Sequence, residues 1–464
     1  MKLPSSGSVA LVLVALCCTL LLACTSLPRI NPDMAHSPAT PVQVDGAGGP
    51  LSDAQSKAIL DRLKASGMAT DIFGLHLAVE EALVGSPLTT GNHVELLQDG
   101  PATYAAMFAA IDGARDHINM ETYILEGDET GQRFADALIA KQRSGVQVNL
   151  IYDSVGTLGT PPEFFARLKE AGIRLVEFNP VNPMTAKAGW ELNQRDHRKL
   201  LIVDGRVAIL GGVNISGVYS GGSFGSSRGR GEGEDLPWRD TDLRLEGPVV
   251  ADLQKLFIST WDRQKGGELV KRHYFPPLEP KGKEVVRAIG SSPEEPYSQI
   301  YATLISALHS AQSEIWLTSA YFVPDPQLLD ALKQAVARGV DVRLVVPSST
   351  DSWLVFHAGR AYYSELLEAG VRIYERRDAL LHVKAGVIDG VWSTVGSTNL
   401  DWRSFLHNQE VNVVVLGADF GERMRQAFLY DVKGSEELTA EKWRKRPVSA
   451  RMSERIGRVW EYWL

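Results

Sequence analysis

Residues 197–214 read H-R-K-L-L-I-V-D-G-R-V-A-I-L-G-G-V-N, a pattern that predicts a β-hairpin with polar side chains at one end. The apolar run after Lys199 is typical of a buried strand, Asp204 and the following glycine form a tight-turn dipeptide, and a second apolar run follows. Because side chains alternate between the faces of a strand, we expect His197 and Lys199 on the same face. Two glycines before Asn214 allow a close approach of the backbone. An imidazole, an ammonium and an amide side chain could therefore converge there.

The same polar pattern occurs a second time, at residues 382–399. His382, Lys384 and Asp389 follow the spacing of the first motif, and Asn399 lies 17 positions after His382, as Asn214 lies 17 positions after His197. Three other segments recur in the same order, each with a helix, a glycine that ends it and a β-branched strand. They are residues 118–123 and 315–321, 144–150 and 338–344, and 168–174 and 367–372.

This internal duplication defines the expected architecture. Strands and helices alternate from residue 94 onward, which indicates an α/β protein. We expect two duplicated α/β/α domains with mixed sheets, packed as a pseudo-twofold pair, with both polar motifs in one cleft. One chain would then complete one active site, so a monomer is sufficient, and the sequence does not determine the oligomeric state.

Composition limits the possible partners. The chain has 464 residues, enough for two or three domains, and is 44% hydrophobic and 22% charged. Its formal net charge of -8 gives no general attraction to DNA or RNA, so no nucleic-acid partner is expected.

The first residues predict export and lipidation. Lys2 precedes an apolar run over residues 9–23, which has the length of a signal-peptide core and is short for a membrane span. The run ends Leu-Leu-Ala-Cys, which resembles a bacterial lipobox with Cys24 as the lipidated first mature residue. Because Thr25 is not the Asp that retains many lipoproteins on the inner membrane, we expect a bacterial protein on the outer membrane, facing the periplasm. A plain signal peptide or an uncleaved anchor is the alternative.

Cysteine usage agrees with this interpretation. All three cysteines lie in the first 24 residues, so the mature chain would keep only Cys24. It could form neither an internal disulfide nor a thiolate metal site.

The chain divides into six predicted parts. Residues 217–235 hold seven glycines and suggest a lid beside the first motif. Residues 442–464 hold seven Lys or Arg and three Trp, which suits a membrane-interface helix or, as the simpler interpretation, a helix docked on the second domain. The parts are 1–24, a lipoprotein-type signal peptide; 25–90, a tether and N-terminal helices at 52–66 and 72–84; 91–265, the first domain; 266–297, a connection; 298–434, the second domain; and 435–464, the basic, Trp-rich tail.

The paired motifs suit phosphodiester chemistry. One imidazole can attack as a nucleophile while the other delivers a proton to the leaving alkoxide. Lys199, Lys384, Asn214 and Asn399 would stabilise the non-bridging oxygens in the transition state. No carboxylate-rich or Cys/His cluster suggests a catalytic metal, and no cofactor is expected.

Supporting residues follow each motif. Each histidine needs a partner on its second ring nitrogen, and the candidates are Asp240 and Glu410. Ser397 precedes Asn399 in the second motif and is a further supporting candidate. Asp204 and Asp389, at the hairpin turns, are expected to shape the loops rather than to react.

The two H-x-K-x4-D-G motifs, followed by G-G-x-N and G-S-x-N, resemble the phospholipase D superfamily over residues 90–464. Residues 196–200, 238–240, 245–249, 319–324 and 396–404 are similar to those of bacterial cardiolipin synthases. Members of that family usually carry two N-terminal membrane helices or no anchor, and the lipobox here departs from this pattern.

The resemblance implies two phospholipase D-like domains and a phosphohistidine intermediate without metal, with His197 as the nucleophile and His382 as the general acid. The symmetry of the motifs leaves that order open at the level of sequence. It also implies a phosphatidyl transferase that acts on phosphatidylglycerol or a similar phospholipid at a membrane surface. A hydrolytic phospholipase D, a nuclease of the superfamily and a non-enzymatic lipid-binding protein are the alternatives.

Overall fold

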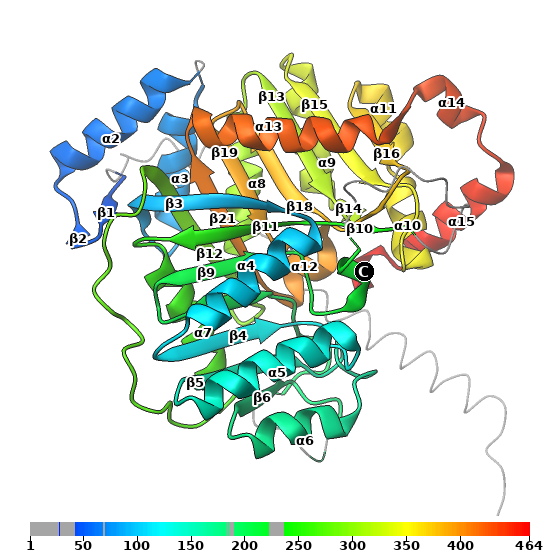
Figure 1. The fold of residues 1–464 in the computed structure, drawn as a ribbon. Coiled ribbons are helices and arrows are strands. Elements are labelled where there is room, and N and C mark those ends of the chain that lie inside the picture. The colour runs from blue at the N-terminus through cyan, green and yellow to red at the C-terminus, as the bar shows by residue number, and fades with distance from the viewer. Residues whose placement is uncertain (1–26, 28–41, 68–69, 183, 185–189, 222–235) are drawn as a thin grey trace, which may run out of the picture.

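A computed structural model describes residues 27, 42–67, 70–182, 184, 190–221 and 236–464 (Figure 1). The predicted signal peptide, the lipidation site Cys24, most of the tether and residues 222–235 of the predicted lid lie outside the described residues.

The first half is an α/β unit with a mixed sheet. Its strands lie in the order β6-β5-β4-β8-β9-β11-β3, with β4, β5 and β6 parallel and the others antiparallel. In chain order the main elements are β3 (Leu88–Gln98), α4 (Asp99–Gly113), β4 (His117–Thr122), α5 (Glu129–Arg143), β5 (Gln147–Asp153), α6 (Pro162–Glu170), β6 (Arg174–Phe178), β8 (Leu200–Val203), β9 (Val207–Gly211), β11 (Thr241–Glu246) and α7 (Val250–Arg263).

The second half repeats this unit. Its strands lie in the order β12-β21-β19-β18-β13-β15-β16, and a further strand, β22 (Ser435–Leu438), pairs with β16. The main elements are β12 (Glu284–Ser291), α8 (Gln299–Ser310), β13 (Glu314–Ser319), α9 (Pro326–Ala337), β15 (Asp341–Pro347), α10 (Trp353–Arg360), α11 (Tyr363–Ala369), β16 (Arg372–Arg376), β18 (Lys384–Ile388), β19 (Trp392–Gly396), β21 (Asn408–Leu416) and α13 (Ala418–Lys433).

The two sheets join edge to edge. β3 and β12 occupy equivalent positions in the two halves and pair antiparallel with each other, so the halves share one continuous sheet about a pseudo-twofold axis. The predicted α/β class and duplication are confirmed. β12 lies within residues 266–297, which the sequence suggested were only a connection. The strand was missed because Arg287 interrupts its apolar pattern; in the fold Arg287 is buried and pairs with Glu80 and Glu81.

Side-chain alternation along the strands builds the core. Leu200 and Ile202 point to one face of the sheet, in an apolar cluster that α7 and α13 share across both halves. Leu201 and Val203 point to the opposite face, toward α4, α5 and α6. In the second half α8, α9 and α11 cover the corresponding face. The halves are thus held together by a common apolar core as well as by strand pairing.

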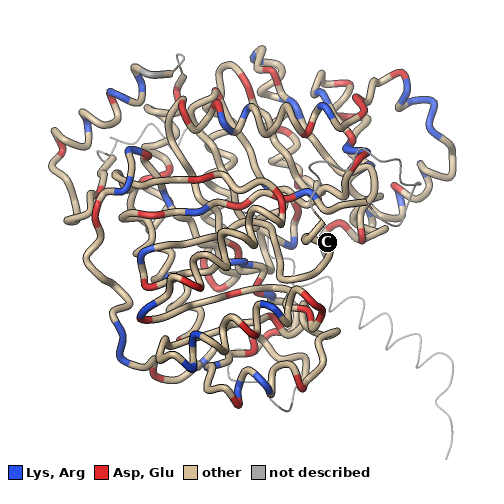
Figure 2. Tube along the Cα trace, in the orientation of Figure 1, with Lys and Arg blue, Asp and Glu red and all other residues tan. Residues whose placement is uncertain are grey.

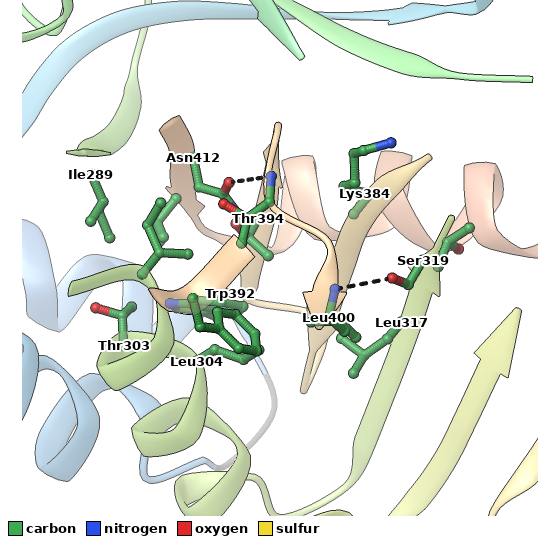
Figure 3. Close-up of a pocket in the computed structure, with 16 residues that line it drawn as sticks. Ile289, Thr303, Leu304, Leu317, Ser319, Lys384, Trp392, Thr394, Leu400 and Asn412 are labelled. Carbon is green, nitrogen blue, oxygen red and sulfur yellow. Dashed lines mark hydrogen bonds between the residues drawn. The ribbon is translucent and has the colours of Figure 1, made fainter. Parts of the chain in front are cut away.

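The second-half core encloses a cavity of about 30 Å³ between α8 and the sheet (Figure 3). Its lining is largely apolar, with Leu317, Leu304 and Trp392 among the side chains that close it. A volume of this size accommodates about one or two water molecules, so the cavity is too small for a lipid head group.

The segment before β3 packs on the second half. Ser52 begins α2 (Asp53–Ser66) with a capping box, and η2 (Ile72–His76) continues into α3 (Leu77–Leu83), close to the predicted helices. The structure differs from the predicted tether at β1 (Val44–Gly46), which pairs with both β2 (Gly49–Pro50) and β3. Val44 is fully buried, so this end of the segment is anchored by packing.

The hairpin-turn aspartates have structural contacts. Asp204 and Asp389 adopt φ values of +54° and +50°, which place each carboxylate next to the loop that enters the neighbouring strand. Asp204 accepts backbone N–H donors of residues 115–117, and Asp389 accepts those of residues 312–314. These hydrogen bonds hold the loops that lead into β4 and β13.

The C-terminal tail is folded against the second half. It forms α14 (Ala440–Arg444), α15 (Val448–Val459) and η5 (Glu461–Trp463), and Lys and Arg gather along α14 and the turn into α15 (Figure 2). Trp443 is buried and its indole donates to Ser364 Oγ at 3.0 Å. Among helices built from the described residues, none has both the length and the hydropathy of a membrane span.

Candidate active site

Both polar motifs meet at one cavity of about 250 Å³. His197 and Asn214 line it from the first half, and His382 and Asn399 line it from the second half. The histidines lie in the irregular segments just before β8 and β18. Each of these segments pairs with the other half: the His197 amide donates to the Gln409 carbonyl at 3.0 Å, and the His382 amide donates to the Arg239 carbonyl at 2.8 Å.

Each imidazole contacts the carboxylate of the opposite half. His197 Nδ1 lies 3.1 Å from Glu410 Oε1, and His382 Nδ1 lies 2.7 Å from Asp240 Oδ2. Both carboxylates are buried behind the imidazoles. A carboxylate on Nδ1 favours the tautomer that carries its proton there and leaves Nε2 for chemistry. The sequence suggested both carboxylates as orienting groups but did not reveal that the pairs cross between halves.

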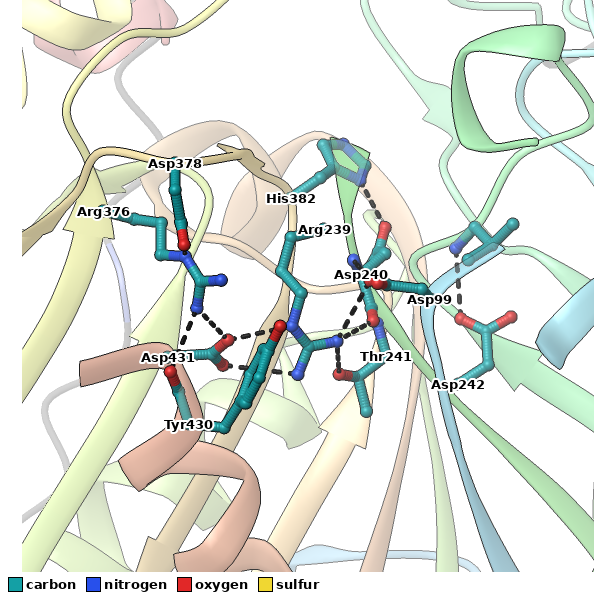
Figure 4. Close-up of polar contacts among 11 residues, drawn as sticks. Asp99, Arg239, Asp240, Thr241, Asp242, Arg376, Asp378, His382, Tyr430 and Asp431 are labelled. Carbon is teal, nitrogen blue, oxygen red and sulfur yellow. Dashed lines mark hydrogen bonds and ion pairs between the residues drawn. The ribbon is translucent and has the colours of Figure 1, made fainter. Parts of the chain in front are cut away.

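Buried arginines fix the crossing segments. Arg239 reaches from the first half to Asp431 of α13, with Nε 2.8 Å from its carboxylate, and holds the backbone on which Asp240 faces His382 (Figure 4). On the other side Arg198 donates to the Glu410 carbonyl at 2.9 Å. Breaking a buried charge pair such as Arg239–Asp431 costs about 3–5 kcal/mol, so this pair strongly constrains the relative position of the two halves.

The two carboxylates have different neighbours. Ser397 Oγ donates to Glu410 Oε2 at 2.5 Å, which connects this supporting residue to the site. The equivalent position in the first half is Gly212, where an added Cβ would lie 2.3 Å from an Asp240 carboxylate oxygen. The first motif therefore needs glycine where the second has serine.

The motif lysines lie behind the cavity rather than in its lining. Lys199 Nζ donates to the His197 carbonyl at 2.6 Å, and Lys384 Nζ donates to the His382 carbonyl at 2.5 Å. Burial lowers the pKa of Lys199 to about 7 and that of Lys384 to about 8. Each ammonium keeps further N–H donors for an anion between the motifs.

The asparagines are held in different ways. Asn214 accepts the Ile124 amide through Oδ1 at 3.1 Å, and its side-chain NH2 donates to Tyr219 at 3.2 Å. Asn399 Oδ1 is buried and has no hydrogen-bond partner within the described part of the chain. Both asparagines line the cavity.

Burial also shifts the titration of the reactive groups. It lowers the pKa of His197 well below its ordinary value, with a further contribution from the nearby lysines, and the pKa of His382 is lowered for the same reasons. Burial raises the pKa of Glu410 to about 7. A neutral imidazole is the form that attacks an electrophile, so the site favours the nucleophilic state of a histidine.

Two tyrosines of the site were not predicted as functional. The ring centroid of Tyr123 lies 5.1 Å from that of His197, and the ring centroid of Tyr321 lies 6.5 Å from that of His382. Both tyrosines line the cavity and end the repeated strand segment at a spacing of 198 residues. The repeat of these two tyrosines at a constant spacing could have identified them from the sequence.

The walls of the cavity break the symmetry of the motifs. Beside His382 lie the aromatic residues Tyr219 and Trp238, with ring centroids 5.9 and 5.3 Å from the imidazole. The residues at the equivalent positions beside His197 are Ser404 and Asn408, both polar. Apart from the repeated tyrosines Tyr123 and Tyr321, the wall beside His382 is therefore aromatic and the wall beside His197 is polar.

Two arginines belong to the polar wall. Arg195 and Arg403 line the cavity, whereas the equivalent positions of the other half hold Leu380 and Val218. Arg195 is buried with Nη1 3.5 Å from Asp153, and that nitrogen makes no hydrogen bond to the described residues. Arg403 donates to the side chain and carbonyl of Asn193 at 3.0 Å each. No carboxylate among the described residues pairs with Arg403, so its charge is available to an anion.

Comparison with known proteins identifies relatives of the whole two-domain unit. A family model described as "Cardiolipin synthase, PLD-like domain" matches residues 107–219 and 304–432. The chain is 35% identical to a cardiolipin synthase of Geobacillus sp. (strain WCH70) over 379 residues, which cover 81% of this chain and 73% of the relative. It is 36% identical over 380 residues to a cardiolipin synthase of Listeria monocytogenes serotype 4a, covering 81% and 76%.

A solved structure with the same fold is the phosphatidylserine synthase of Haemophilus influenzae Rd KW20. The TM-score is 0.60 at 13% identity, and the match covers 84% of this chain and 100% of the other. This similarity supports the assignment of the fold.

The carboxyl group of Asp401 provides a test of the electrostatics. It lines the cavity, accepts the Ser404 amide at 2.7 Å, and has a pKa raised to about 7 by burial. Because the folded state keeps its proton to higher pH than the unfolded state, this group lowers stability as pH rises from about 4 to about 7. Asp401→Asn keeps the N-cap of the short helix α12 (Trp402–Leu406) and is expected to raise the free energy of unfolding by about 2–4 kcal/mol at pH 8, with little change at pH 4.

Urea unfolding at both pH values measures this difference. Asp419→Asn is the control, because Asp419 is exposed and its pKa is lowered by Lys283, so no gain at pH 8 is expected. Equal free energies of unfolding for the wild type and Asp401→Asn at pH 8 would contradict the raised pKa.

Proposed function

The chain belongs to the cardiolipin synthase family of the phospholipase D superfamily, and we propose that its two histidine motifs move a phosphatidyl group from one phospholipid to the head-group alcohol of another. It is thus a cardiolipin synthase-like phosphatidyltransferase, with phospholipid substrates such as phosphatidylglycerol. The observation that carries the residue assignment is the pair of buried imidazoles at one cavity, each with a carboxylate on Nδ1.

The first step forms a phosphohistidine. Nε2 of one imidazole attacks phosphorus, the bond from phosphorus to the glycerol oxygen breaks, and the protonated second imidazole donates its proton to that oxygen. The resemblance to the superfamily gives His197 the nucleophilic role and His382 the role of the acid. In the second step the acceptor hydroxyl transfers its proton to His382 and attacks phosphorus, which breaks the P–N bond and restores both imidazoles.

Charge on the non-bridging oxygens is balanced by the motif side chains. Lys199 and Lys384 supply positive charge from behind the histidines, and the amides of Asn214 and Asn399 line the cavity. Preorganised donors of this kind contribute about 3–4 kcal/mol each to transition-state stabilisation in enzymes.

The polar wall suits an acceptor that carries its own phosphate. Phosphatidylglycerol used as the acceptor brings a second phosphodiester into the site, one glycerol away from the reacting phosphorus. We propose that Arg403, with Arg195 beside it, binds this second phosphodiester. Both guanidinium groups line the same cavity as the two imidazoles, within reach of a phosphate that is bound next to the reacting one. Water and simple alcohols lack a phosphodiester and cannot make this contact. The contact would therefore favour transfer to a phospholipid over hydrolysis.

The location of the enzyme is also a proposal. A lipidated Cys24 would hold the chain on the periplasmic side of the outer membrane, where its substrates are confined to the same surface. The lipobox-like end of the apolar run at residues 9–23 supports this assignment.

The central test is product analysis with phosphatidylglycerol vesicles. The purified protein is expected to release glycerol and form cardiolipin in equal amounts, measured by mass spectrometry. His197→Ala and His382→Ala are each expected to reduce the rate by at least about 10⁴-fold, because each removes a group of the covalent step. Formation of phosphatidic acid alone would replace the transferase by a hydrolytic phospholipase D, and full activity of either variant would refute the mechanism.

Arg403→Ala tests the acceptor assignment. The variant removes the guanidinium group proposed to bind the second phosphodiester, and this loss is expected to reduce cardiolipin formation about 10- to 100-fold. Transfer to ethanol, which gives phosphatidylethanol and involves no second phosphate, is expected to stay within about twofold, because transition-state contacts to the reacting phosphorus are unchanged. Arg372→Ala, which removes an exposed arginine paired with Glu437, is the control. A parallel fall in both products would contradict the assignment.

Lipidation is tested by metabolic labelling. The chain expressed in a bacterial host is expected to incorporate radioactive palmitate, and Cys24→Ala is expected to abolish the label because no other cysteine remains after cleavage. An unlabelled wild-type chain would favour a plain signal peptide or an uncleaved anchor.

A further inference from the structure

We propose that α15 is a bilayer-docking helix whose exposed apolar face lies in the phospholipid surface next to the active-site cavity. The proposal rests on the proposed function for its substrate, a lipid in a bilayer. It concerns a surface of the protein that takes no part in the chemistry of the histidine motifs.

One face of α15 anchors the helix to the domain. Glu454 is buried and accepts hydrogen bonds from Arg446, the shortest at 2.7 Å. Gly457 lies directly against α10, where an added Cβ would come 2.5 Å from the Ala358 backbone nitrogen. α15 is therefore held in a defined orientation, which fixes what its other faces present to solvent.

A second face exposes large apolar side chains. Val448, Met452, Ile456 and Val459 recur at intervals of three or four residues and so form one stripe along the helix. Their exposed fractions are 72%, 60%, 51% and 78%. Large apolar side chains that remain exposed in a row, on a helix that is already packed by another face, mark an interaction surface.

A third face is basic. Arg451, Arg455 and Arg458 are exposed and lie beside the apolar stripe. Further Lys and Arg gather along α14 (Figure 2), where Lys442 pairs with Glu436 and Lys445 with Glu441. The chain as a whole carries a formal net charge of -8, so this concentration of positive charge is local. An apolar stripe flanked by arginine and lysine is the pattern of a helix that lies in the interface of an anionic bilayer. We therefore assign the surface to an anionic bilayer rather than to a protein partner.

The helix lies beside elements that line the active-site cavity. α10 packs against α15, and Val355 of α10 lines the cavity. The C-terminal residue Leu464, five positions after Val459, also lines it. Trp353, at the start of α10, is 54% exposed and adds an aromatic side chain of the kind that favours the membrane interface. A bilayer in contact with α15 would therefore lie close to the site that its lipids must reach.

A local fluorescence measurement tests the contact directly. The full chain with Cys17, Cys18 and Cys24 changed to Ser contains no cysteine, so Met452→Cys can carry a single environment-sensitive NBD group. Phosphatidylglycerol vesicles are expected to shift its emission to the blue and to raise its intensity about twofold or more, as transfer from water into the apolar interface does. The shift should weaken in vesicles of phosphatidylcholine alone, since the arginines contribute only on an anionic surface.

The matched control is Phe275→Cys with the same label. Phe275 is 53% exposed, close to the 60% of Met452, but lies on the segment that packs against the hairpin turn at Gly205, away from the motif histidines. It should show no shift. An unchanged emission at position 452, or an equal shift at position 275, would overturn the proposal. Because this readout requires no turnover, it is independent of the proposed function.

Activity supplies a second test. The double variant Met452→Glu and Val459→Glu is expected to reduce turnover of phosphatidylglycerol vesicles roughly 10-fold or more, because two charges replace apolar contacts with the bilayer. Turnover of short-chain phosphatidylglycerol below its critical micelle concentration should remain within about twofold, because no bilayer is then involved. Equal losses on both substrates would overturn the docking role. Absence of activity in the wild type on either substrate would instead count against the proposed function.

Discussion

The crossed contacts between imidazole and carboxylate are the constraint on which the site depends. Glu410 holds His197, and Asp240 holds His382, so neither half can orient its own histidine. An imidazole without a partner on Nδ1 would populate both tautomers and would rotate, which lowers the fraction of molecules ready to react. Catalytic competence therefore requires that the two halves be registered to within hydrogen-bond distance.

The fold provides this registration at several levels. β3 pairs with β12 to make one sheet, α7 and α13 share one apolar cluster, and Arg239 reaches Asp431 across the boundary. Each contact joins residues that are far apart in the sequence, so forming it costs chain entropy. That cost is offset only when the rest of the core has formed. The site is consequently assembled by the completed fold rather than by either half, and a loosened interface between the halves would reduce activity before it unfolded the chain.

The duplication, the α/β class and the residues of both motifs could be predicted from the sequence. A repeat with constant spacing can be recognised even where the local secondary structure is uncertain. The sequence was insufficient for contacts that depend on how the halves meet. Tertiary packing determines which carboxylate contacts which histidine. It also places the lysines behind the cavity and buries the strand around Arg287. Arg195 and Arg403 were missed for a related reason, since symmetry drew attention to residues that repeat, and these do not.

Those non-repeating residues explain how a symmetric motif can support a selective reaction. Two equivalent imidazoles around one phosphorus would exchange glycerol and phosphatidylglycerol without preference. An aromatic wall beside His382 and a polar, cationic wall beside His197 make the two approaches to the phosphorus chemically different. Each alcohol then has a different binding energy in the transition state according to whether it carries a phosphate. A symmetric phosphodiesterase site can thus become a selective transferase when the residues of its walls change and both histidine motifs stay the same.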